Sequence, residues 1–115
     1  MDWRANAARE FADRRFSQRG LTLTKLARDL GVSPRYLGRI FRNENGQTFH
    51  RYLLGVRMAQ ARDLLDDRTL SLREIASRVG YEDVSNFCKE FRRMFGESPR
   101  AYFKIRQLTL PASWN

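Results

Sequence analysis

The sequence predicts an all-α fold of about seven helices, with two helix-turn-helix subdomains joined by a long central helix. Apolar residues recur at helical spacing along almost the whole chain, and strand signals are absent. The segment from Leu23 to Gly46 returns as a similar segment from Leu72 to Gly96. In each copy a glycine, Gly31 or Gly80, separates two helical patterns. This order of helix, tight turn and helix predicts the two subdomains.

The two copies match position by position. Leu23, Leu26, Ala27, Leu30 and Gly31 match Leu72, Ile75, Ala76, Val79 and Gly80. After one extra residue in the second turn, Ser33, Leu37, Phe41, Arg42 and Gly46 match Asp83, Phe87, Phe91, Arg92 and Gly96. Two copies are too few for a solenoid, which needs about three repeats to bury a core.

The first predicted subdomain covers residues 1–47. Its first helix is expected to place one stripe in the core and to end at Gly20; the stripe is Trp3, Ala7, Phe11 and Arg15. Thr22 is expected to cap the next helix, and Gly31 to end it. A third helix starts with Ser33 as N-cap and Pro34 at the first helical position, and closes at Gly46.

A linker helix is predicted within residues 48–67, as the longest of the chain and shared by both halves. Its inward residues are expected to be Phe49, Tyr52, Leu53, Val56, Ala59 and Leu64. The second subdomain, residues 68–106, opens with a capping box of Ser71 and Glu74. Gly80 is expected to end its first helix, Asp83 to cap the next one and Gly96 to end it. Ser98 and Pro99 start a last helix, and residues 107–115 form a tail.

Composition bounds the partners and excludes several classes of protein. A chain of 115 residues with a net charge of +9 and a pI near 10.8 indicates an anionic partner. One cysteine excludes a disulfide framework, and one histidine argues against a zinc site, so no metal or cofactor is expected. No run of about 18 apolar residues and no apolar signal core is present, so we expect a cytoplasmic protein without a membrane partner.

The second helix of a helix-turn-helix enters the major groove, and its N-terminal half contacts base edges. In the first copy the inner face is expected to be Leu37, Ile40 and Phe41. The outer residues are then Arg35, Tyr36, Gly38, Arg39 and Arg42, of which Tyr36 and Arg42 are expected to contact the DNA backbone. Arg35 and Arg39 are four apart and share a face, which suits guanine edges or phosphates. The alternative is an ordinary solvated basic face.

In the second copy the inward residues are expected to be Phe87, Phe91, Met94 and Phe95. Ser85, Asn86 and Lys89 remain outside as candidate base contacts, and Arg93 as a phosphate contact. This set is less charged than the first, so the first copy is expected to contribute more to sequence recognition. The helix starts at Thr22 to Thr24 and Ser71 to Arg73 offer amides to phosphates, or serve only as caps.

Other reactive residues have structural explanations. Cys88 is expected to pack against the groove or core; the alternative is a redox switch whose thiol pKa Lys89 lowers. His50 is expected on the surface, and Asp66 with Asp67 at a helix end rather than in a catalytic pair. No phosphate loop, Ser/His/Asp set or metal-ligand spacing occurs, so an enzyme is not expected.

The segment GYEDVSNFCKEFRRMFGESPRAYF, Gly80 to Phe103, resembles the signature of the AraC/XylS family of bacterial transcription regulators. The stretch RMAQARDLL, Arg57 to Leu65, is also similar. The resemblance implies two helix-turn-helix subdomains bridged by the long helix on one face of DNA, with base contacts at Arg35, Gly38, Arg39, Ser85, Asn86 and Lys89. Two departures from the family pattern are Gly38, which has no side chain, and Ser85, which is a weak base contact.

The resemblance further implies a DNA-binding activator associated with the bacterial nucleoid. The length of the chain fits either a stand-alone regulator, like the MarA/SoxS-type members, or the C-terminal domain of a larger effector-responsive regulator. The expected partner is double-stranded DNA, with RNA polymerase as a second candidate. A monomer is expected, or a dimer within a larger regulator. The competing hypothesis is a helical protein-interaction module that acts through the transcription machinery.

Overall fold

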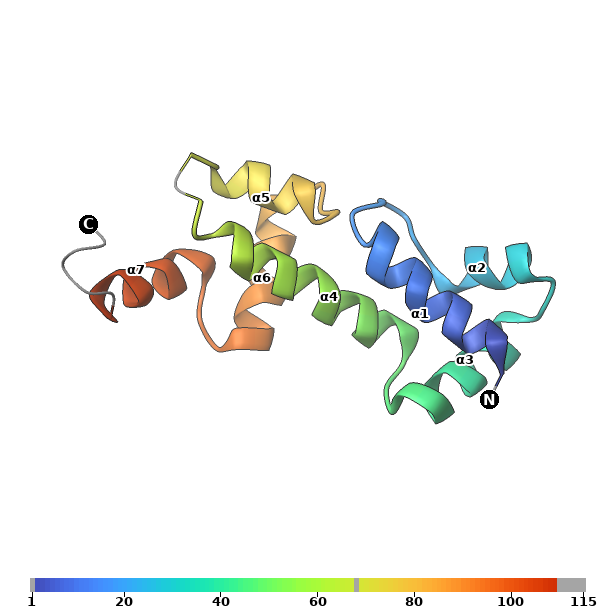
Figure 1. The fold of residues 1–115 in the computed structure, drawn as a ribbon. Helices are drawn as coiled ribbons and strands as arrows, with labels where there is room; N and C mark the ends of the chain where they lie inside the picture. The colour runs from blue at the N-terminus through green and yellow to red at the C-terminus, as the bar shows by residue number, and fades with distance from the viewer. Residues whose placement is uncertain (1, 68, 110–115) are drawn as a thin grey trace. The chain divides into compact units, whose positions relative to one another are not determined.

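The computed structural model describes residues 2–67 and 69–109, and side chains as far as residue 104. These residues form seven helices and no strand, which confirms the predicted fold class. The helices are α1 (Trp3–Arg15), α2 (Leu23–Leu30), α3 (Pro34–Asn45), α4 (Phe49–Leu64), α5 (Leu72–Arg78), α6 (Val84–Phe95) and α7 (Pro99–Thr109), as Figure 1 shows. The tail was predicted to begin at residue 107, but α7 continues to Thr109, and residues 110–115 lie outside the described residues.

The chain divides into two compact units, Met1–Arg57 and Met58–Asn115. The first unit holds α1, α2, α3 and the beginning of α4, and the second holds the rest of α4 with α5, α6 and α7. Each unit therefore contains one of the two sequence copies. The helix pair of the first copy is α2 and α3, and that of the second is α5 and α6.

The core of the first unit is built around α3. Phe41 is fully buried, and its ring meets the rings of Phe49 and Tyr52 edge-on, with centroids 5.5 Å and 5.7 Å away. Leu37, one turn earlier, is also fully buried. Leu53 of α4 closes this cluster at 3% exposure.

The buried face of α1 differs from the predicted stripe. Ala5, Ala8 and Ala12 are fully buried, whereas Trp3 is 62% exposed and Arg15 lies in solvent. Small side chains let α1 approach the rest of the unit closely, and this packing selects the alanine face over the larger residues. The helix also ends at Arg15 rather than at Gly20, which adopts a positive φ of 72° in the following turn.

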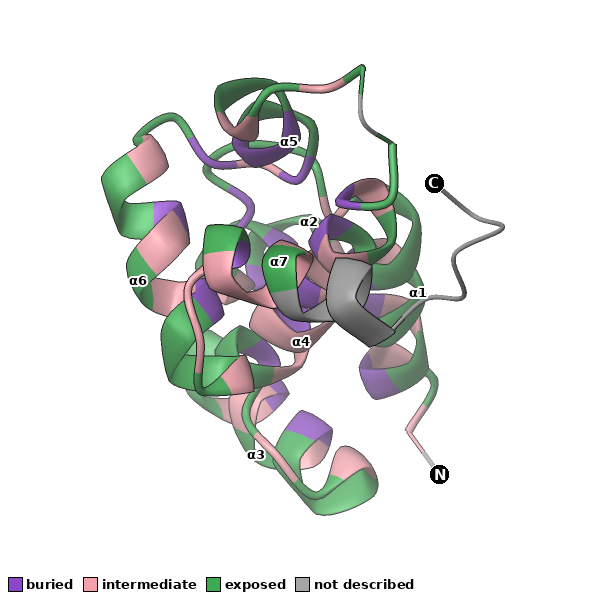
Figure 2. Cartoon of the chain, turned by 90° about the vertical axis from the view of Figure 1, so that its left-hand side faces the viewer, coloured by how far each residue is buried: buried purple, intermediate pink, exposed green. Residues whose placement is uncertain are grey.

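The core of the second unit contains the aromatic residues of α6. Phe87 and Phe91 are fully buried, and Figure 2 shows buried and exposed residues alternating along this helix. Met94 was expected inside but is 39% exposed, a correction with a clear cause. The apolar stripe continues from the buried Phe91 to the half-buried Phe95, four residues on, and the Tyr102 ring of α7 lies 5.7 Å and 6.1 Å from these two rings. Met94 is left on the outer side of that stripe.

The predicted inner face of α4 is correct in its first half only. Phe49 and Leu53 are buried, but Val56, Ala59 and Leu64 are only half-buried. In the second half the buried residues are Met58 and Ala61, followed by Leu65 directly after the helix end. Each unit thus takes its own stripe of the helix, and a single continuous stripe was the wrong assumption.

Candidate nucleic-acid interface

Local signals delimit α3 sharply. Gly31 ends the preceding helix in the left-handed conformation, with a φ of 71°. The Ser33 hydroxyl then accepts a hydrogen bond from the backbone N–H of Tyr36 at 3.1 Å, and Pro34 occupies the first turn. Gly46 closes α3 with a φ of 76°, donating its N–H to the carbonyl of Arg42. The predicted cap, start and end are confirmed.

The second copy delimits α6 in the same way with different residues. The Asp83 carboxylate accepts from the backbone N–H of Ser85 at 2.8 Å, and Gly96 ends the helix at a φ of 82°. One difference lies in the turn, where Val79 caps α5 and Gly80 takes a φ of 100°. The extra residue of the second copy is accommodated there, outside α6.

The outer face of α3 is basic. Arg35, Arg39 and Arg42 are all exposed, while Leu37 and Phe41 hold the opposite face in the core. An open groove of about 900 Å³ runs along this face, entirely within the first unit. All the predicted first-unit site residues except Thr24 line it, namely Thr22, Arg35, Tyr36, Gly38, Arg39 and Arg42.

Eight further residues of the same groove were not predicted as site residues, and three of them are neither apolar nor the Ser33 cap. These three are Asn43, Thr48 and His50. Asn43 follows Arg39 by four residues, so helical spacing from the predicted arginines would have found it. Thr48 accepts from the backbone N–H of Arg51 at 3.2 Å, and His50 lies exposed in the first turn of α4, on the surface as expected.

Gly38 lies where α2 approaches α3. A Cβ atom added there would stand 3.2 Å from the Cδ2 atom of Leu23. The absence of a side chain therefore allows close contact between the two helices. This packing explains why a glycine occupies position 38, which the sequence alone did not.

Tyr36 is the half-buried member of this face. Its hydroxyl donates a hydrogen bond to the Asp2 carboxylate at 2.7 Å, and this bond raises the pKa of Tyr36 above its ordinary value. The Arg39 guanidinium lies over its ring, 5.6 Å from the centroid. A phosphate contact by the Tyr36 hydroxyl would have to replace the bond to Asp2.

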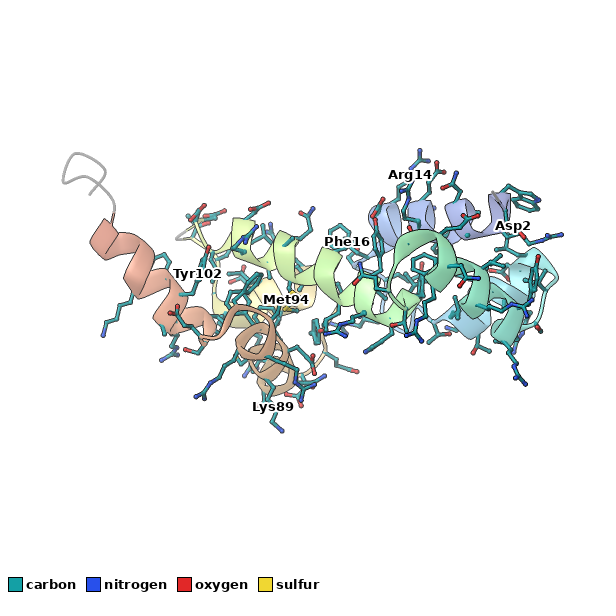
Figure 3. All side chains as sticks on the ribbon, turned by 90° about the horizontal axis from the view of Figure 1, so that it is seen from below. Asp2, Arg14, Phe16, Lys89, Met94 and Tyr102 are labelled. Carbon is teal, nitrogen blue, oxygen red and sulfur yellow. The ribbon has the colours of Figure 1, made fainter. Side chains whose placement is uncertain are left out.

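The outer face of α6 carries shorter and fewer charged groups. Ser85, Asn86 and Lys89 are exposed, and Figure 3 shows Lys89 directed away from the ribbon. Arg93 is exposed and lies 3.5 Å from the Glu90 carboxylate, which would compete with a phosphate for it. Arg92, the counterpart of Arg42 in the repeat, is also exposed, although the predicted site omitted it.

The predicted helix starts are genuine caps. The Thr22 hydroxyl accepts from the N–H of Lys25 at 3.3 Å. Ser71 and Glu74 form the reciprocal capping box, with bonds of 3.1 Å and 3.3 Å. The neighbouring Thr24 and Arg73 side chains are exposed at the two starts.

The remaining reactive groups have structural roles. Burial raises the pKa of the Cys88 thiol, and Arg100 opposes this only partly, so Lys89 does not produce the lowered pKa that a redox switch requires. Asp67 accepts hydrogen bonds from the N–H and hydroxyl of Thr69 at 2.9 Å and 2.7 Å, which lowers its pKa and closes a turn. This confirms Asp67 as part of a helix end and turn.

The part of the chain that the structure describes offers neither a metal site nor a membrane span. Within it, no group of three or more histidine, cysteine, aspartate or glutamate side chains is arranged to hold a metal ion. None of the helices in this part of the chain combines the length and apolar character that crossing a membrane requires.

Residues 26–105 match the family model of a helix-turn-helix domain. The uncharacterized HTH-type transcriptional regulator YpdC of Escherichia coli (strain K12) is 38% identical over 82 residues, which are 71% of this chain and 29% of that protein. The chain belongs to the AraC family of helix-turn-helix transcription regulators. Members of this family that match the chain are regulators with DNA-binding domains and not enzymes.

Solved structures of AraC-family DNA-binding domains share the fold over nearly the whole chain. The C-terminal domain of AraT, a response regulator from Geobacillus stearothermophilus, is 36% identical with a TM-score of 0.86, covering 97% of this chain and 90% of that one. The DNA-binding domain of AdpA, solved in complex with a target DNA, is 27% identical with a TM-score of 0.84, covering 94% and 96%. The chain spans about a third or less of the curated relatives' length.

Proposed function

We propose that this AraC-family domain binds double-stranded DNA sequence-specifically and inserts α3 and α6 into two successive major-groove segments. The observation that carries the proposal is the same construction in both units. Each of these helices has a capped start, a glycine end, a fully buried aromatic face and an exposed polar face. A helix anchored in this way presents its outer face to a groove at little conformational cost.

The exposed side chains divide between two kinds of contact. We assign base contacts to the N-terminal halves of the two helices, at Arg35, Gly38, Arg39, Ser85, Asn86 and Lys89, with Gly38 limited to its backbone. We assign phosphate contacts to Arg42, Arg93, Thr22, Thr24, Ser71 and Arg73. Tyr36 was also predicted as a backbone contact, but its hydroxyl is already donated to Asp2, so we assign it no phosphate. Guanidinium groups suit guanine O6 and N7, and the Asn86 amide suits adenine.

The first unit is proposed to supply most of the sequence preference. Arg35 and Arg39 can each make bidentate contacts, whereas Ser85 is short and tolerant of several bases. The acidic Glu90 beside Arg93 further weakens the field at α6. The bound site is therefore expected to be asymmetric, with one segment more restricted than the other.

In the cell we propose an activator that acts beside RNA polymerase in the bacterial cytoplasm, at the nucleoid. The domain would do so either as a stand-alone monomer or as the C-terminal part of a larger effector-responsive regulator, where a dimer becomes available. Both arrangements leave the DNA-binding face of the domain the same.

The test is fluorescence anisotropy with a duplex selected from a random pool and with a random duplex, over a series of salt concentrations. The proposal predicts tighter binding to the selected duplex. It also predicts affinities that fall steeply with salt, because phosphate contacts release counterions. A helical interaction module would show neither preference nor a steep slope, and that result would refute the proposal.

A further inference from the structure

We propose that Asp2 and Tyr36 form a positioning pair that holds the Arg39 guanidinium in the orientation needed for base contact. The inference rests on the proposed function, because it concerns how a base-contacting side chain is oriented. It assigns a role in DNA recognition to Asp2, a residue at the start of α1 and outside both helix-turn-helix motifs.

Asp2 and Tyr36 are joined by a hydrogen bond. The Tyr36 hydroxyl donates to Asp2 Oδ2 at 2.7 Å across 34 positions of sequence. Asp2 Oδ1 accepts at the same time from the backbone N–H of Arg4 at 2.9 Å, which makes Asp2 the N-cap of α1. The carboxylate is therefore held by α1, and it restricts rotation of the Tyr36 ring about its two side-chain bonds.

The Tyr36 ring in turn contacts the Arg39 guanidinium. The guanidinium carbon of Arg39 lies 5.6 Å from the centroid of the Tyr36 ring, within the range of a cation–π contact. A guanidinium held over an aromatic ring can still offer its N–H groups to a bidentate bond. An exposed arginine otherwise has about 2 kcal/mol of side-chain entropy to lose on binding. Stacking on a fixed ring removes part of that loss beforehand.

A second hydrogen bond joins Asp2 to the last turn of α3. The backbone N–H of Asp2 donates to Glu44 Oε1 at 2.7 Å. Tyr36 lies in the first turn of α3 and Glu44 in its last, so the start of α1 contacts both ends of the helix. The fully buried Ala5 and Ala8 then bring α1 close along its length.

The second unit lacks this arrangement at the corresponding position. Asn86 occupies the place of Tyr36 in the repeat, and Lys89 that of Arg39. An amide side chain offers no aromatic face for the Lys89 ammonium. The positioning pair is therefore a property of the first unit, which is the unit proposed to dominate base recognition.

The experiment measures the ratio of affinities for a selected and a random duplex, using the full chain at fixed salt. The variants are Tyr36→Phe, which keeps the ring and removes the hydroxyl, and Asp2→Ala. We expect each to lower this ratio about three- to tenfold, the range of one hydrogen bond. The loss should fall on the base pair whose preference Arg39→Ala also relaxes. Asp2→Asn keeps one oxygen that can accept from the Arg4 N–H but replaces the second acceptor with an NH₂ donor, so it should lower the ratio about as far as Tyr36→Phe does.

The matched control is Tyr52→Phe. Tyr52 donates a similar hydrogen bond, 2.6 Å long, from α4 to the Asp13 carboxylate of α1, but it is not in contact with Arg39. Its removal should change thermal stability and leave the affinity ratio unchanged. An equal fall of the ratio in Tyr52→Phe and Tyr36→Phe would mean that Tyr36 only supports the fold, and would overturn the proposal.

The decisive comparison repeats Asp2→Ala and Tyr36→Phe in an Arg39→Ala background. If the pair acts through Arg39, neither change lowers the ratio further. Additive losses overturn the positioning role while leaving the proposed function intact. A wild-type chain that prefers no selected duplex overturns the proposed function itself, so the two failures are distinguishable.

Discussion

Replacing Phe41 with alanine tests the packing that holds α3 in place. The side chain is fully buried and makes edge-on ring contacts to Phe49 at 5.5 Å and Tyr52 at 5.7 Å. Truncation of a buried phenylalanine costs about 3–5 kcal/mol, and the lost ring pairs place this site at the upper end. A unit of this size has a total stability of only a few kcal/mol, at roughly 0.05–0.15 kcal/mol per residue. We therefore expect the first unit to be largely unfolded in the variant at 37 °C.

The assay is urea unfolding followed by far-ultraviolet circular dichroism, with Trp3→Ala as the contrast. Trp3 is 62% exposed and contacts the Arg4 guanidinium at 5.2 Å, so its loss should cost less than about 1 kcal/mol. The predicted order is a large effect at Phe41 and a small one at Trp3. A Phe41→Ala variant within about 1 kcal/mol of the wild type, or a Trp3→Ala variant as unstable as Phe41→Ala, would show that the Phe41 ring does not hold α3 in place.

Arg39, Gly55 and Tyr52 each allow a separate test. Arg39→Ala should weaken binding to the selected duplex by about 1–3 kcal/mol and relax one base preference in an anisotropy titration. Arg14 is exposed at the end of α1 (Figure 3), and Arg14→Ala should do neither. Equal losses of affinity in the two variants would make Arg39 an ordinary surface charge. Gly55→Ala should stabilise the chain by about 0.5–1 kcal/mol in a denaturant titration, because a Cβ there meets nothing within 4 Å; a lower midpoint would contradict this. Burial and the bond to Asp13 raise the pKa of Tyr52 from 10.0 to about 12, so its contribution to stability is complete below pH 10 and lost as the pH rises toward 12. The melting temperature of Tyr52→Phe should therefore fall less than that of the wild type between pH 10 and 12. Equal falls in the two proteins would show that Tyr52 does not contribute this pH-dependent stability.

The helices and their limits could be predicted from sequence because local chemistry determines them. Ser33 with Pro34 starts α3, Gly46 ends it, and Ser71 with Glu74 forms a capping box, all from contacts within a few residues. Such signals act before tertiary packing and survive it.

The choice of buried face could not be predicted as well, because several apolar faces compete on one helix. In α1 the stripe containing Trp3 and Phe11 is larger, but the smaller alanine face allows closer packing and is buried. In α6, Met94 and Phe95 both lie about one turn beyond Phe91, and contact with Tyr102 decides in favour of Phe95. These decisions depend on residues distant in sequence.

The candidate site shows the same division. The outward placement of Arg35 and Arg39 follows from helical spacing alone and was predicted. The contact of Tyr36 with Asp2 joins residues 34 positions apart, and the approach of Gly38 to Leu23 depends on how two helices pack. No local pattern in the sequence encodes either contact.

The use of two recognition helices by one chain is tested by selecting duplexes from a random pool with the full chain, and then with Arg39→Ala and Lys89→Ala. We expect an asymmetric site with two informative segments one helical turn, roughly 34 Å, apart. Arg39→Ala should blur one segment and Lys89→Ala the other. A single informative segment, or a palindrome bound only by a dimer, would contradict the claim that one chain uses two recognition helices.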